Sequence, residues 1–157
     1  MKIGGERFLR EDIKNIKVAV IGDIMLDRYI SGNVERISPE APVPINLVKS
    51  QRNVLGGAAN TAANLSSLGG QVFISRMRGN DRDGDTLSEL LRAAGIDDTG
   101  VIVSEEYSTT TKVRILGARQ QMMRLDFEER CNPDDKVCKY ILKWLDQLIQ
   151  HRIGSIV

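Results

Sequence analysis

Two short polar motifs contain the residue types needed to hold a carbohydrate. In the first, Gly56 and Gly57 precede a run of small residues that ends at Gly70, and this run predicts a helix with Asn60 in its first turn. Unpaired backbone N–H groups at a helix N-terminus, together with a side-chain amide, favour a polar or anionic ligand. The alternative is a tight helix entry followed by an Ala-rich packing face.

The second motif, Gly22–Asp27, places two carboxylates after a buried apolar run at 18–21 that predicts a strand. Open α/β sheets bind their ligands beyond the carboxyl ends of the strands. Asp27 is therefore a candidate to accept hydrogen bonds from sugar hydroxyls. For Asp23, a role in a turn or as a helix cap fits the sequence as well as a role in ligand binding does.

Three cations in the second half of the chain have the spacing of a shared strand face. Lys112, Arg114 and Arg124 fall on alternate positions of two β-like runs, and Arg119 lies in the connection between these runs. Gathered on one face, the three would suit a phosphate group. Spread outward, they would form an ordinary solvated edge.

Several other chemistries are excluded by their motifs. No Lys-Ser or Lys-Thr follows the glycines, and no Gly-x-Gly-x-x-Gly follows a strand, so both common nucleotide-binding motifs are absent. The acidic run at 80–85 has its glycine too early for a calcium loop, and helix capping by Asp81 or Asp83 explains it better. Cys131 and Cys138 have no partner set for zinc, so we expect reduced thiols and no metal.

The overall composition predicts one globular domain that acts in the cytoplasm. The chain has 157 residues, of which 41% are hydrophobic, and its net charge is +1. This charge gives no general reason to expect binding to nucleic acid or to an anionic membrane. No apolar run approaches the roughly 20 residues of a membrane helix, and the first fifteen residues lack a secretory pattern.

The hydrophobic periodicity predicts a doubly wound α/β domain that positions these motifs. Helices and strands alternate, and the strand at 18–21 is apolar on both faces, as in a parallel sheet covered by helices. In the last helix, the positions of one buried face are Val137, Ile141, Trp144, Leu145 and Leu148, and Asn132 and Pro133 are its expected start. The predicted strands are 18–21, 72–75 and 101–103, and the predicted helices are 6–16, 57–68, 83–94 and 134–150.

Two segments interrupt the alternation. Residues 29–48 contain three prolines between β-like pieces, and residues 110–127 form two alternating runs joined through 117–119, which predicts a hairpin. Antiparallel pieces inserted into a parallel core often make a lid. An edge ribbon is the alternative.

Together these motifs resemble the N-terminal half of the ribokinase-like (PfkB) family of carbohydrate kinases. The resemblance rests on Gly22–Asp27, Gly56–Asn60 and Gly79–Gly84, and it covers the chain from Lys17 onward. The stretches 36–44 and 120–129 resemble the branch that acts on heptose 7-phosphate. The resemblance implies a ribokinase-like three-layer α/β/α sheet with a small β-lid at about 29–48 and 110–127. Residues 1–157 would be the N-terminal, sugar-binding half of a kinase domain.

The resemblance also implies a reaction. It is the ATP-dependent phosphorylation of D-glycero-β-D-manno-heptose 7-phosphate at its anomeric hydroxyl, in the ADP-heptose pathway for lipopolysaccharide, with ATP and Mg²⁺ bound by the complete enzyme. The general-base Asp belongs to the C-terminal half of the family's domain, so no catalytic residue is assigned in this chain. The implied substrate-binding residues are Asp27, Gly56, Gly57, Asn60, Lys112, Arg114, Arg124 and Asp126.

The end of the sequence completes these expectations. The chain stops in an apolar β-like run at 153–157, so we expect it to be half of a kinase. We expect this half to be inactive alone, and we also expect a homodimer formed through the lid. Two other functional classes remain open at this point. One is a non-catalytic sugar- or nucleotide-binding module, and the other is an interaction protein that uses the ribbon at 110–127.

Overall fold

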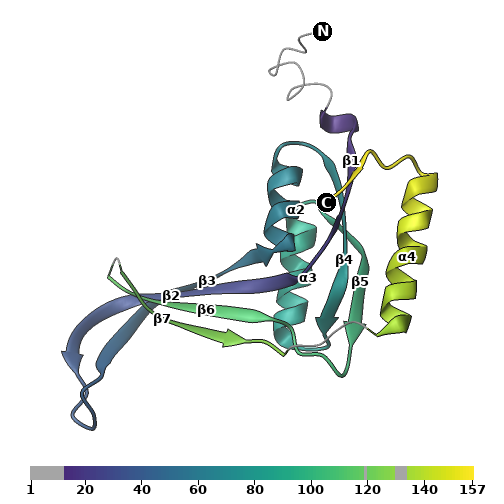
Figure 1. Cartoon of the computed structure of the whole chain (residues 1–157). Coiled ribbons are helices and arrows are strands. Elements are labelled where there is room, and N and C mark those ends of the chain that lie inside the picture. The colour runs from purple at the N-terminus through teal and green to yellow at the C-terminus, as the bar shows by residue number, and fades with distance from the viewer. Residues whose placement is uncertain (1–12, 119, 130–133) are drawn as a thin grey trace.

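The computed structural model describes residues 13–118, 120–129 and 134–157, and it contains two four-stranded sheets (Figure 1). The core sheet has the order β5-β4-β1-β8, with every neighbouring pair parallel. The three strands expected from the sequence therefore lie in one sheet, although β4 and β5 are longer than predicted. Their bounds are Lys17–Ile21 for β1, Gln71–Gly79 for β4, Asp97–Ser104 for β5 and Ser155–Ile156 for β8.

Helices cover both faces of the core sheet, which gives the three layers that the sequence predicts (Figure 1). Helices α2 (Ala58–Ser67) and α3 (Arg82–Ala93) pack on one face, and α4 (Asp135–Gln150) lies on the other. Successive side chains of β1 point to opposite faces of the core sheet. Val18 and Val20 join the apolar cluster under α2 and α3, and Ala19, between them, is buried as well. This double burial explains the continuous apolar run of β1.

Helix α4 follows the predicted apolar face, and Trp144 is its most buried residue at 7% exposure. Its indole packs on the backbone of β5 so closely that a Cβ at Gly100 would lie 2.5 Å from the ring. The side chain of Asp134 caps the helix by accepting from Val137 N at 2.8 Å. The expected cap residues Asn132 and Pro133 lie outside the described residues, as do Cys131 and most of the helix predicted at 6–16. Its last part, Ile13–Asn15, is a 3₁₀ helix.

The second sheet, which we call the lid sheet, extends away from the core (Figure 1). Its order is β3-β2-β6-β7, and its strands are β2 (Ile24–Ile37), β3 (Pro44–Gly57), β6 (Thr111–Gly117) and β7 (Gln120–Phe127). The predicted hairpin at 110–127 is confirmed, and the two interrupting segments form a sheet separate from the core. The lid is larger than predicted, because β2 pairs with β3 from Ile24 opposite Gly57 to Ile37 opposite Pro44, with two register shifts on the way.

The two faces of the lid sheet differ in chemistry. Residues directly opposite one another on paired strands project to the same side, so the register assigns each side chain to a face. The face that we call the charged face carries Asp27, Tyr29, Arg52, Lys112, Arg114, Arg124 and Asp126. The face that we call the apolar face carries Leu26, Ile30, Leu55, Val113, Ile115, Met123, Leu125 and Phe127.

Candidate functional site

The junction between the core and the lid sheet brings the first two motifs together. The chain leaves β1 at Ile21, enters the lid at Ile24, and returns through Gly57 to α2. Gly57 has φ 58°, and a Cβ there would overlap the carbonyl oxygen of Asp23. That oxygen accepts from Ala58 N at 2.9 Å. The positive φ and the close approach both require glycine at this point.

Gly56 creates room for a carboxylate at the same junction. It is buried, and a Cβ on it would lie 2.7 Å from Oδ2 of Asp27. The other oxygen, Oδ1, accepts from the guanidinium of Arg114. Helix α2 starts beside this carboxylate without a side-chain cap, and Asn60 is exposed in its first turn. Asp27, both glycines and Asn60 are therefore gathered at one place in the fold, which can present a carboxylate, an amide and bare backbone to a polar ligand.

The three predicted cations share the charged face, so they are not spread outward. Arg114 lies directly opposite Arg124, and Lys112 lies opposite Asp126. Each cation has an acidic partner: Arg114 pairs with Asp27, Lys112 approaches Glu128 at 3.5 Å, and Arg124 forms two bonds to Asp126 at 2.8 and 3.0 Å. The hydrogen bond to Asp27 raises the pKa of the Arg114 guanidinium above its ordinary value. The charged face is thus a network of alternating charges beside the junction.

Two residues that the sequence analysis did not select complete this face. Tyr29 lies between Arg52 on β3 and Arg114 on β6. The guanidinium carbons of these arginines are 4.7 and 5.3 Å from the ring centroid. The alternation of β2 could have placed Tyr29 beside Asp27, whereas Arg52 becomes its neighbour only through the β2–β3 register.

The comparison with known proteins identifies the family. Residues 15–141 match the profile of the pfkB family carbohydrate kinases. The chain belongs to the pfkB family of carbohydrate kinases. It is 52% identical over 112 residues to the bifunctional protein HldE of Methylobacillus flagellatus, which covers 71% of this chain and 23% of that protein. It is 41% identical over 145 residues to the D-beta-D-heptose 7-phosphate kinase of Bordetella bronchiseptica, covering 91% and 45% respectively.

Solved structures show the same fold. A putative sugar kinase from Clostridium perfringens aligns with a TM-score of 0.65 and 16% identity, over 90% of this chain and 42% of that one. Ribokinase from Cryptococcus neoformans, solved in complex with ADP, aligns with a TM-score of 0.53 and 20% identity, over 71% and 34%. This pfkB-family chain therefore spans less than half the length of each of these relatives.

The acidic run of this pfkB-family chain has a structural role. Asp81 is the N-cap of α3, as predicted, and it accepts from Gly84 N at 2.7 Å and from Thr109 N at 2.8 Å. Burial alone would raise the pKa of Asp81, but these backbone hydrogen bonds, with the nearby Arg78, lower it below its ordinary value. Asp81 thereby ties α3 to the segment that leads into β6.

Asp83 makes a second connection, which the sequence analysis did not anticipate. Its Oδ1 lies 2.5 Å from Arg28 Nη2 on β2, and its Oδ2 accepts from Thr111 Oγ1 on β6 at 2.8 Å. Arg28 also donates to Asn53 on β3 at 3.0 Å. One carboxylate in the first turn of α3 thus connects the core to the lid sheet. We call the contacts among Asp83, Arg28, Thr111 and Asn53 the lid latch.

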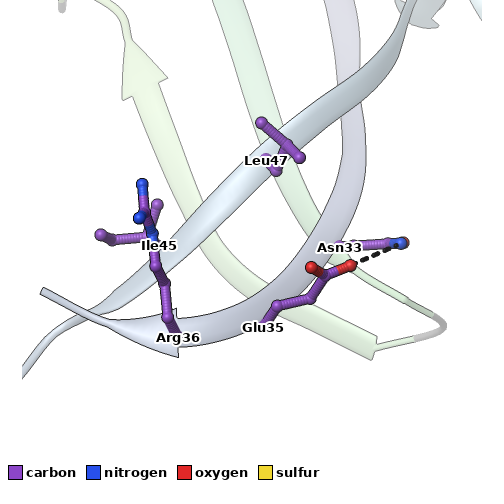
Figure 2. Close-up of a pocket in the computed structure, with 5 residues that line it drawn as sticks. All are labelled: Asn33, Glu35, Arg36, Ile45 and Leu47. Atoms are coloured by element: carbon purple, nitrogen blue, oxygen red, sulfur yellow. Dashed lines mark hydrogen bonds between the residues drawn. The ribbon is translucent and has the colours of Figure 1, made fainter.

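Two remaining features lie beside or away from the junction. The side chain of Asp23 pairs with Arg76 on β4 at 2.6 Å. A shallow hollow of about 190 Å³ lies near the far end of the lid, lined by Asn33, Glu35, Arg36, Ile45 and Leu47 (Figure 2). Asn33 follows Asp27 by six positions on β2, roughly 20 Å along an extended strand. The hollow is therefore not part of the candidate sugar site.

Proposed function

We propose that this chain is the sugar-binding part of a kinase that transfers phosphate from ATP to the anomeric hydroxyl of D-glycero-β-D-manno-heptose 7-phosphate, in the supply of ADP-heptose for lipopolysaccharide. The observation that carries the proposal is the junction, where the Asp27 carboxylate lies against Gly56 beside a face of cations. The similarity to the D-beta-D-heptose 7-phosphate kinase of Bordetella bronchiseptica favours this sugar. Because the proposed reaction uses ATP, we propose that it takes place in the cytoplasm.

The proposed roles follow from the geometry of the junction. Arg114 orients Asp27 through Oδ1, which leaves Oδ2 to accept a hydrogen bond from a sugar hydroxyl over Gly56. Asn60 offers its amide to a neighbouring hydroxyl. The two glycines let the sugar approach the backbone closely. Such positioning is the main contribution a sugar-binding half can make to phosphoryl transfer.

The charged face is proposed to meet the phosphate end of the substrate. Lys112, Arg114 and Arg124 supply positive charge there, and Asp126 holds the Arg124 guanidinium in a bidentate pair. The planar guanidinium of an arginine can bind a phosphate through two parallel N–H donors, as it binds a carboxylate.

ATP and Mg²⁺ are assigned to another part of the kinase domain. The sequence carries neither common phosphate-binding glycine motif. Within the described ranges, no group of three or more His, Cys, Asp or Glu side chains is placed to hold a metal ion. We therefore propose that the general base and the nucleotide site lie in the portion of the domain that this chain does not span.

Calorimetric titration of the 157-residue protein with heptose 7-phosphate and with ATP tests the proposal. We expect binding of the sugar phosphate, no binding of ATP, and no formation of heptose 1,7-bisphosphate when both are supplied. Binding of ATP alone would favour a nucleotide-binding module. Binding of neither would favour an interaction protein that uses the lid sheet.

A homodimer through the lid is part of the same proposal. The apolar face exposes Met123, Leu125 and Phe127 by 54%, 39% and 59%, and a second copy would cover them. Sedimentation should show a dimer that Leu125→Glu converts to a monomer, whereas Glu128→Gln should leave it intact. A monomeric unaltered protein would contradict this part of the proposal.

Among the helices of the described residues, none has the length and apolar composition that a membrane span requires.

A further inference from the structure

Three arginines and one tyrosine form a row across all four strands of the lid sheet. The register places Arg52 opposite Tyr29, Tyr29 beside Arg114, and Arg114 opposite Arg124. All four side chains belong to the charged face. Arg52 and Arg114 both lie within cation–π distance of the Tyr29 ring. One aromatic ring therefore positions two guanidinium groups that come from the strands on either side of it.

The charge on this row is not balanced evenly. Arg114 pairs with Asp27 and Arg124 pairs with Asp126. Arg52 is exposed, and within the ranges 13–118, 120–129 and 134–157 no carboxylate forms an ion pair with it. An arginine held by an aromatic ring but not paired with an acid keeps its donors available for a planar, bidentate contact with an anion.

The spacing of the row relative to the junction indicates which anion it would meet. Tyr29 follows Asp27 by two residues on the same face of β2, so the row lies roughly 7 Å from the carboxylate along the strand. That separation suits a sugar whose hydroxyls bind Asp27 and whose phosphate lies at the opposite end of its carbon chain. We propose that Arg52, positioned by Tyr29, contacts the substrate's phosphate group and selects phosphorylated sugars over unphosphorylated ones. The inference rests on the proposed sugar site.

The test compares how tightly two sugars bind to the protein expressed from its own gene. Calorimetry gives dissociation constants for heptose 7-phosphate and for the unphosphorylated heptose. Arg52→Gln should weaken the phosphorylated sugar by about tenfold or more, because a charged hydrogen bond is lost, and should change the unphosphorylated sugar by less than about twofold. Lys49→Gln is the matched control, since it removes the same charge from β3 at a residue outside the row, and it should change neither constant.

A second pair of variants tests the positioning role of the ring. Tyr29→Leu removes the ring that holds Arg52, so it should weaken only the phosphorylated sugar. Tyr29→Phe keeps the ring and should restore most of that affinity. Arg52→Lys should recover less than Tyr29→Phe, because an ammonium group keeps the charge but loses the planar contact.

The outcomes separate this inference from the proposed function. If the unaltered protein binds both sugars with equal affinity, or if Arg52→Gln weakens both equally or neither, the inference is overturned while the sugar site stands. If inorganic phosphate binds as tightly as the phosphosugar, the row is a general anion site and its role in substrate selection is refuted. Binding of neither sugar by the unaltered protein would overturn the proposed function and, with it, this inference.

Discussion

The core and the lid of this chain are stabilised by different means. In the core, a parallel sheet lies between helices, and side chains such as Ile74, Leu87 and Leu91 are fully buried. In the lid, the base of the sheet is buried at residues such as Leu26 and Val113, but every residue of the outer strand β7 is exposed. The core therefore depends mainly on apolar burial, whereas the lid depends more on backbone pairing and on polar contacts such as the lid latch. The candidate site lies where these two regions meet.

The largest expected effect contrasts the stability of the two regions. Leu87→Ala deletes a fully buried side chain of α3 and should lower the free energy of unfolding by about 2 to 5 kcal/mol. Leu47→Ala removes a side chain that is 56% exposed on the lid and should cost less than about 1 kcal/mol. Urea denaturation monitored by the fluorescence of Trp144, which lies in the core, measures both. Equal losses would mean that the lid packs as the core does.

The next effect separates the two ends of the proposed sugar site. Asp27→Ala should weaken heptose 7-phosphate and heptose alike, by about ten- to a hundredfold, because hydroxyls lose a charged partner. Arg124→Ala should weaken the phosphorylated sugar far more than the other. Binding titrations of each variant with the two sugars measure both ratios, and equal losses on the two sugars for Arg124→Ala would remove Arg124 from the phosphate end.

A smaller effect is expected from the lid latch. Asp83→Asn weakens the contacts to Arg28 and Thr111 and should cost roughly 1 to 2 kcal/mol, which should appear mainly as faster hydrogen exchange in β2 and β6. Asp85→Asn is the control, since Asp85 is in the same first turn but pairs with Arg78 within the core. If both variants speed exchange in the core and the lid to the same extent, Asp83 has no specific role in holding the lid.

The smallest effect is a pH dependence at the start of α3. The pKa of Asp81 is lower in the folded chain than its ordinary value of 3.8, so its contribution to stability is present above that value. The contribution is lost as the pH falls below about 3.8 and through the folded pKa. Asp81→Asn should remove this part of the pH dependence, which denaturation series between acidic and neutral pH would detect. A steeper dependence in the variant would contradict the assignment.

The sequence predicted the elements whose signals are local. The apolar positions of α4 recur at the helical period, and Trp144 is buried as that period requires. Gly69 and Gly95 follow α2 and α3 with positive φ values, as helix-terminating glycines do. Asp81, the N-cap of α3, directly precedes that helix in the sequence. Each of these features depends on residues within a few positions of one another, so composition and spacing were enough to predict it.

The extent of the lid was decided by tertiary pairing. The sequence places Gly22–Asp27 at the end of a core strand, but residues from Ile24 onward belong to a lid strand because β3 pairs with them as far as Gly57. A two-residue alternation indicates which side chains share a face of one strand. It does not indicate which strand lies beside it.

The sequence by itself determined the chemical groups of the site: the glycines, the Asp27 carboxylate and three cations on alternate positions. Only the tertiary structure decided which of these groups meet. Long-range register places Arg52 against Tyr29, pairs Arg114 with Asp27, and brings Asp83 from α3 to two strands of the lid. The physical reason is that strand pairing is set by contacts between residues far apart in the chain, which no local spacing encodes.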